Sequence, residues 1–212
     1  MTSAETSLAV ARSVLLRRTG AIALAWALTL VAAVALLLAF ADRPPIVRDA
    51  NLVANDGFET GVAPWRVYGR GLLERSTVVA RTGNASGRME ANDFEEYGMQ
   101  VWGGVVRPRP GDLYAFSVWL KGEGAAVGNE VTVQMNEHGG VLEDETDRWI
   151  AGVDRVVRRE WTQVRVVGRV IGDGRDSVDL FVIADDARRI GETVYVDDLT
   201  LVKLQAGREP SE

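Results

Sequence analysis

From residue 51 onward, apolar and polar residues alternate in short runs, and this alternation constrains the fold more than any other feature of the chain. Successive side chains of a β-strand point to opposite faces, so a period of two is typical of half-buried strands. Gly, Asn, Asp and Pro residues separate the runs at intervals close to ten residues. This spacing, together with the lack of any amphipathic helical pattern over ten or more residues, indicates an all-β domain.

We therefore predict an all-β, two-sheet antiparallel jelly-roll sandwich over residues 51–203, followed by a flexible polar tail at 204–212. The predicted strands are 51–54, 65–68, 72–80, 87–90, 97–106, 113–121, 130–136, 161–171, 177–184 and 193–202.

Residues 20–41 have a different character, because these 22 residues carry no charge. As a helix they would extend roughly 33 Å, which matches a bilayer core of about 30 Å. Three arginines precede the segment, at 12, 17 and 18, and positive charge favours the cytoplasmic side. The sequence thus predicts a cytoplasmic N-terminus (1–19), one transmembrane signal-anchor helix (20–41), a proline-containing linker (42–50) and a domain outside the cell membrane.

An alternative is open for this segment, because Ala39-Phe40-Ala41 has the small-x-small form of a signal peptidase site. Cleavage after Ala41 would give a secreted protein. The apolar run is longer than the 7 to 15 residues usual for a signal peptide, which favours a retained anchor.

Charge and composition exclude several function classes. Residues 1–41 hold three of the 24 basic and one of the 30 acidic residues, which leaves an excess of eight acidic residues in the rest. Such a domain should repel nucleic acid. The chain has no cysteine and one histidine, His138, which leaves no thiol nucleophile and little histidine chemistry. No two carboxylates fall on adjacent ends of predicted strands, where they could act as a general acid and base. We therefore expect neither a nucleic-acid partner nor an enzyme.

Four stretches resemble, in order and spacing, carbohydrate-binding modules of families 4, 9 and 22. They are NLVANDGFETG at 51–61 followed by Trp65, PGDLYAFSVWLKG at 110–122, EWTQVRV at 160–166 and VYVDDLTL at 194–201. The resemblance covers residues 51–202 and implies a galactose-binding-like jelly roll that binds a glycan without catalysis. The same sandwich also serves as a non-binding spacer beside other domains.

Strand alternation predicts a binding face. In 113–121 the core face holds Tyr114, Phe116, Val118 and Leu120, which places Trp119 on the opposite face. Aromatic rings can cover the C–H faces of a sugar, and planar amides can pair with its hydroxyl groups. The same argument applied to three other strands predicts one glycan-binding face with Gln100, Trp102, Trp119, Gln134, Asn136 and Phe181.

A competing interpretation is that the predicted 143–157 insertion covers Trp102 or Trp119 and that Phe181 packs beneath it. Trp65 is expected in the core, whereas Tyr68 and Trp149 are left unassigned. His138 is expected at the end of a hairpin rather than as a ligand.

The resemblance also implies a structural calcium ion away from the glycan face. Carried over by position, its ligands are the Gly57 carbonyl, the Glu59 carboxylate and Asp198, with a carbonyl from the turn at 82–86. Glu59 and Asp198 would alternatively only cap turns.

These observations predict a membrane-anchored or secreted, non-catalytic carbohydrate-binding module with a polysaccharide or glycan as its partner. The alternative is a structural or adaptor sandwich that contacts another envelope protein, as an accessory to polysaccharide assembly.

Overall fold

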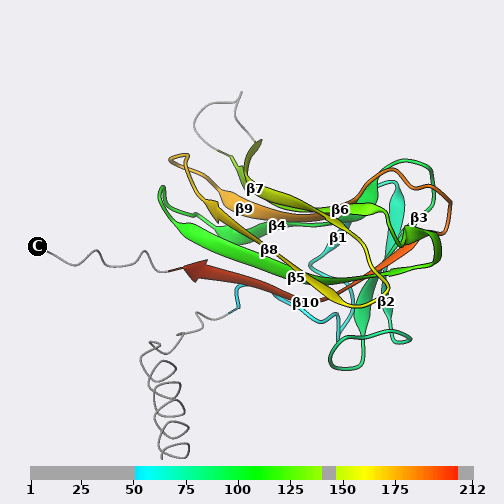
Figure 1. Cartoon of the computed structure of the whole chain (residues 1–212). Helices are drawn as coiled ribbons and strands as arrows, with labels where there is room; N and C mark the ends of the chain where they lie inside the picture. Colours follow the sequence, from blue (N-terminus) through cyan, green and yellow to red (C-terminus); the bar gives the residue numbers. More distant parts are fainter. Residues whose placement is uncertain (1–50, 140–146, 205–212) are drawn as a thin grey trace, which may run out of the picture. The chain divides into compact units, whose positions relative to one another are not determined.

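The computed structural model describes residues 51–139 and 147–204, which fall in one compact unit and form two antiparallel five-stranded sheets (Figure 1). In the order in which the strands pair, the first sheet contains β1 (Arg66–Gly69), β4 (Tyr97–Val106), β9 (Ser177–Ala184), β6 (Glu130–His138) and β7 (Asp147–Val156). The second contains β2 (Gly71–Ser76), β3 (Ser86–Ala91), β10 (Thr193–Leu204), β5 (Leu113–Glu123) and β8 (Thr162–Arg169). One short 3-10 helix, η1 (Gly124–Ala126), follows β5. The predicted all-β sandwich is confirmed.

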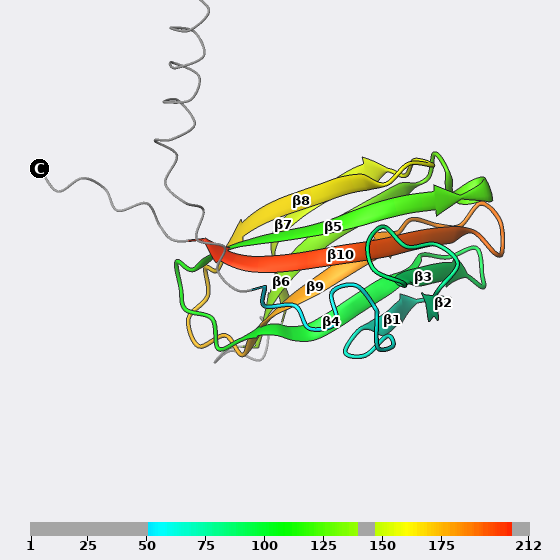
Figure 2. The ribbon, with the colours of Figure 1, turned by 90° about the horizontal axis from the view of Figure 1, so that it is seen from below.

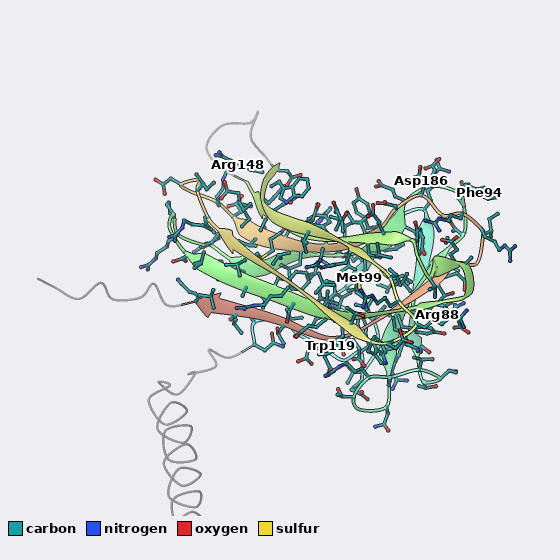
Figure 3. All side chains as sticks on the ribbon, viewed as in Figure 1. Arg88, Phe94, Met99, Trp119, Arg148 and Asp186 are labelled. Carbon is teal, nitrogen blue, oxygen red and sulfur yellow. The ribbon has the colours of Figure 1, made fainter. Side chains whose placement is uncertain are left out.

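The core lies between the two sheets, as the alternation predicted. In β5, Tyr114, Phe116, Val118 and Leu120 are all buried. Met99 of β4 lies between the layers (Figure 3). Burial of apolar surface stabilises a sandwich by about 25 cal/mol per Å², so the inward rows of both sheets dominate its stability.

The strand predictions hold closely for β4 and β9, two others need correction, and one strand was not predicted. Residues 51–54 form no strand, and β2 ends at Ser76 rather than at residue 80. Residues 147–156, which the sequence placed in an insertion, form the edge strand β7. Most of β7 is exposed, so it lacks the alternation of apolar residues by which the other strands were recognised.

Residues 51–54 instead run beside the end of β10 (Figure 2). The Leu52 amide donates to the Leu201 carbonyl at 2.8 Å. Asn51 adds two side-chain bonds: its Nδ2 donates to the Leu199 carbonyl at 2.9 Å, and its Oδ1 accepts from the Leu201 amide at 2.9 Å. The Asn51 side chain thus holds residues 51–54 to β10 where strand pairing was predicted.

The predicted membrane segment at 20–41, the linker at 42–50 and residues 205–212 of the predicted tail lie outside the described residues. Within 51–139 and 147–204 there is no helix with the length and apolar character needed to span a bilayer.

Candidate functional site

A groove of about 320 Å³ lies on the outer face of the first sheet. Its walls and floor come from all five strands of that sheet. The residues that line it are Tyr68, Gln100, Trp102, Gln134, Asn136, His138, Asp147, Asp179 and Phe181. The structure therefore brings together five of the six residues predicted for the glycan-binding face.

Trp119 is the exception, because β5 belongs to the second sheet. It lies opposite Asp197 of β10, and the Arg81 guanidinium stacks on its ring at 3.6 Å from the centroid. Figure 3 shows Trp119 on the far side of the sandwich from Arg148 of β7. The prediction that Trp119 shares a face with Trp102 is wrong, since alternation separates inward from outward positions but does not say which sheet a strand joins.

Trp102 presents the most accessible ring of the groove lining. It is 62% exposed, so the interpretation in which an insertion covers it does not hold. Its Nε1 donates to Gln100 Oε1 at 3.2 Å, and the Arg66 guanidinium lies 5.8 Å from the ring centroid. These two contacts restrict the orientation of the indole before any ligand binds, which lowers the entropy cost of binding.

Phe181 lies in the floor of the groove and is only 7% exposed. The Tyr68 ring meets it edge-on, with centroids 5.8 Å apart and an interplanar angle of 87°. Burial and the neighbouring Glu96 raise the pKa of Tyr68, whose hydroxyl donates to Glu96 at 3.2 Å. Phe181 therefore supports the groove from below, and Tyr68, which the sequence left unassigned, forms its wall.

Two amides in the groove lack partners. Gln134 lies opposite Phe181, and Asn136 lies opposite Asp179, in the pairing of β6 with β9. Neither side chain makes a hydrogen bond within the described part of the chain, and Asn136 Oδ1 is buried there without a partner. A buried acceptor without a partner costs about 1–3 kcal/mol. A ligand that donates a hydroxyl proton to it would recover this energy.

A histidine and two carboxylates occupy one end of the groove. His138 ends β6 opposite Asp147, the first residue of β7, and Nδ1 of His138 lies 2.6 Å from Oδ1 of Asp147. This hydrogen bond raises the pKa of His138 despite the opposing effect of burial. His138 does end a hairpin strand, as predicted. The sequence missed its place in the groove, because its partner lies on the unpredicted strand β7.

Trp149 of β7 supplies a second exposed ring on the same face. It lies opposite Asn136 and is 60% exposed. Gly152 makes room for it, since a Cβ on this glycine would lie 2.4 Å from Trp149 Cζ2. Strands β9 and β6 separate Trp149 from Trp102 on β4. Three strand spacings amount to about 14 Å, so roughly that distance separates the two residues across the sheet.

The residues predicted to bind calcium lie on the other side of the fold and are only partly brought together. Near Gly57, a Cβ would lie 3.6 Å from Asp197 Oδ1 and 4.0 Å from Glu59 Oε1. Asp198 instead forms an ion pair with Arg81. The alternation of β10 breaks here, because the pairing with β5 shifts register after Asp197 and Asp198 has a φ of 46°. Asp197 therefore takes the place expected for Asp198.

The carboxylates near Gly57 already accept backbone hydrogen bonds. Glu59 Oε1 accepts from the Asn84 amide at 2.8 Å, and Asp197 Oδ2 accepts from the Arg81 amide at 2.7 Å. Asp197 is fully buried, and burial raises its pKa although the backbone donors oppose this effect. These bonds agree with the turn-capping alternative, and Glu59 and Asp197 each have a second oxygen that a cation can share.

Comparisons with known proteins identify similar solved structures. No protein-family model matches the chain, and no curated protein does. The xylan-binding domain CBM22-1 of Paenibacillus barcinonensis Xyn10C has a TM-score of 0.60 at 12% identity, covering 76% of this chain and 98% of that domain. TmCBM61, solved in complex with β-1,4-galactotriose, has a TM-score of 0.51 at 21% identity, covering 73% and 99%.

A family 16 carbohydrate-binding module has a TM-score of 0.53 at 21% identity and covers 72% of this chain and 99% of the module. Family 22 is among those whose motifs the sequence resembles. At these identities the likeness concerns the fold. The described part of this chain therefore has the jelly-roll fold of carbohydrate-binding modules.

Proposed function

We propose that this protein is a non-catalytic carbohydrate-binding module and that a polysaccharide or glycan lies in the groove on the outer face of the first sheet. The observation that carries the proposal is the groove itself, which is lined by the exposed ring of Trp102, by Gln134 and by Asn136 with its buried, unpartnered Oδ1. The carbohydrate-binding modules with the same fold support it.

The chemistry of these residues fits a neutral sugar chain. Trp102 and Trp149 offer apolar faces for the C–H surfaces of sugar rings, and the two amides offer donors and acceptors to hydroxyl groups. Each stacked ring would contribute on the order of 1–3 kcal/mol. One or two such contacts give dissociation constants in the micromolar to millimolar range.

A glycan array probed with the purified protein, followed by titration of the best ligand, tests the proposal. We expect Trp102→Ala to weaken binding at least about tenfold. Phe94→Ala is a matched control, because Phe94 is 58% exposed but does not line the groove. Absence of any ligand on the array, or unchanged binding by Trp102→Ala, would contradict the proposal and favour an adaptor that contacts a protein.

We also propose, from the sequence, that residues 20–41 anchor the domain outside the cell membrane. Membrane fractionation combined with N-terminal sequencing tests this. A mature chain that begins at Asp42 would show the secreted form instead.

A structural calcium ion is proposed near Gly57, with Glu59 and Asp197 as its carboxylate ligands in place of the predicted Glu59 and Asp198. The arrangement around Gly57 supports this set, since Asp198 is already paired with Arg81. Calcium would neutralise charge between the buried carboxylate of Asp197 and the exposed carboxylate of Glu59, and it would take no part in glycan binding.

A further inference from the structure

His138, Asp147 and Asp179 form a compact group at one end of the groove. Each offers one ligand atom, and these atoms all lie within 4.8 Å of one another. They come from three neighbouring strands, β6, β7 and β9. Backbone pairing fixes their spacing, because His138 lies directly opposite both Asp147 and Ser177, and Ser177 Oγ donates to Asp179 Oδ1 at 2.7 Å.

Asp179 gives an independent reason to expect a cation. It is only 2% exposed, and its Oδ1 accepts from the Gly103 amide at 2.8 Å as well as from Ser177. Its Oδ2 has no partner among residues 51–139 and 147–204, and no Lys or Arg of that part pairs with Asp179 or Asp147. The nearby His138 imidazole, itself a candidate ligand, compensates this charge only when it is protonated. A carboxylate buried beside a neutral imidazole is costly, and a bound cation removes that cost.

The donor set identifies the class of ion. Calcium prefers six to eight oxygen ligands, whereas an imidazole nitrogen beside two carboxylates suits zinc or a similar divalent transition metal. Three protein ligands leave at least one coordination position free. Because all three residues line the groove, that position faces the space proposed for the glycan. Asn136 lies opposite Asp179 on the neighbouring strand, and its buried Oδ1, which has no hydrogen-bond partner among the described residues, is a further acceptor at this end.

We propose that His138, Asp147 and Asp179 bind a divalent transition-metal ion of the zinc type, and that a hydroxyl oxygen of the bound glycan occupies a free coordination position. The second half of this statement rests on the proposed glycan-binding function, whereas the metal site does not. The metal thereby adds a directional contact at the end of the groove that holds the carboxylates of Asp147 and Asp179.

Calorimetric titration of the purified, chelator-treated protein with zinc chloride tests the metal site. We expect one equivalent to bind, and affinity to fall at least tenfold in His138→Gln and in Asp179→Asn. Asp176→Asn is the matched control, because the Asp176 charge also acts on His138 but lies outside the group. Circular dichroism of each variant shows whether it is folded. No zinc binding by the native protein, or equal binding by folded His138→Gln, overturns the site.

Titration of the array-identified glycan with and without zinc tests the second half. Tighter glycan binding with zinc, lost in His138→Gln, supports it. If zinc binds but leaves glycan affinity unchanged, the coordination of a hydroxyl is wrong while both the metal site and the glycan groove stand. If zinc binds and no glycan does, the proposed function falls and the metal site remains.

Discussion

Gly152 shows how the absence of one side chain shapes the groove. Trp149 lies across the position that a Cβ would occupy, so its exposed ring rests against the backbone of the edge strand rather than projecting away from it. The ring therefore lies over Gly152 on the outer face of the sheet, the face that also carries Trp102. The sequence shows neither the contact between Trp149 and Gly152 nor the face on which Trp149 lies. The relative positions of a glycine and a tryptophan three residues apart depend on the strand that contains them.

We expect Gly152→Ala to displace the Trp149 ring while the protein remains folded. Glycan binding should weaken about fivefold, equivalent to about 1 kcal/mol, and the tryptophan emission spectrum should shift. Titration and fluorescence measure the two effects. In a Trp149→Ala background the glycine substitution should add nothing further, and an additive effect would show that it acts by another route.

Asp112 provides a pH-dependent contribution to stability. Its carboxylate accepts from Lys203 Nζ at 2.7 Å and from the Tyr114 hydroxyl at 3.1 Å. Burial alone would raise the pKa of Asp112, but these bonds and one from the Arg109 amide outweigh it and lower the pKa. A lowered pKa in the folded state stabilises the protein above the unfolded pKa, near 4, and this contribution disappears as the pH falls through the folded pKa.

Asp112→Asn should therefore lower the free energy of unfolding by about 1 kcal/mol at pH 7. The difference from the native protein should shrink as the pH falls below about 4. Urea unfolding at pH 7 and pH 3 measures it. An equal difference at both values would mean that charge on Asp112 contributes nothing.

At the scale of elements, the first residues of the domain are held to the last strand by side-chain bonds. Asn51 bonds to the backbone of Leu199 and Leu201 in β10, although residues 51–54 were predicted to form a strand. The sequence shows a short apolar run at 51–54. The backbone groups of so short a run at a sheet edge can be bonded by a side chain as well as by a paired strand, so the run alone does not distinguish the two.

Asn51→Ala should lower the free energy of unfolding by about 1–3 kcal/mol, because two bonds to buried backbone groups are lost. Asn51→Asp keeps the acceptor for the Leu201 amide and should cost less. Urea denaturation of both variants measures the effect. Equal stability of Asn51→Ala and the native protein would show that Leu52 and its neighbours suffice.

For the molecule as a whole, alternation was enough to predict the sandwich, its core and most strand positions. It was not enough to assign strands to sheets, which depends on pairing between distant residues; Trp119 and Trp102 were placed together for this reason. Alternation also does not predict where a strand shifts register, as β10 does after Asp197. The metal-ligating group was missed because Asp147 begins an edge strand with little apolar content.

Addition of calcium tests the proposed ion near Gly57, which would link Glu59, near the start of the domain, to Asp197 in the last strand. We expect saturating calcium to raise the melting temperature by roughly 5–10 °C, corresponding to about 2.7 kcal/mol at a hundredfold excess over Kd. Differential scanning calorimetry measures the shift. Glu59→Gln should abolish it and Asp198→Asn should retain it. A shift lost in Asp198→Asn but kept in Glu59→Gln would contradict the assignment of Asp197.

The strand that carries Trp149 and Asp147 is also where the first sheet stops. An exposed sheet edge invites pairing with a strand of another chain, and charged side chains discourage it. β7 is the last strand of its sheet, and it carries Asp147, Arg148, Asp154 and Arg155. A sugar has no peptide groups with which to extend a sheet, so charged residues on this edge would disfavour pairing between copies of the domain without opposing the oligosaccharide proposed for the groove.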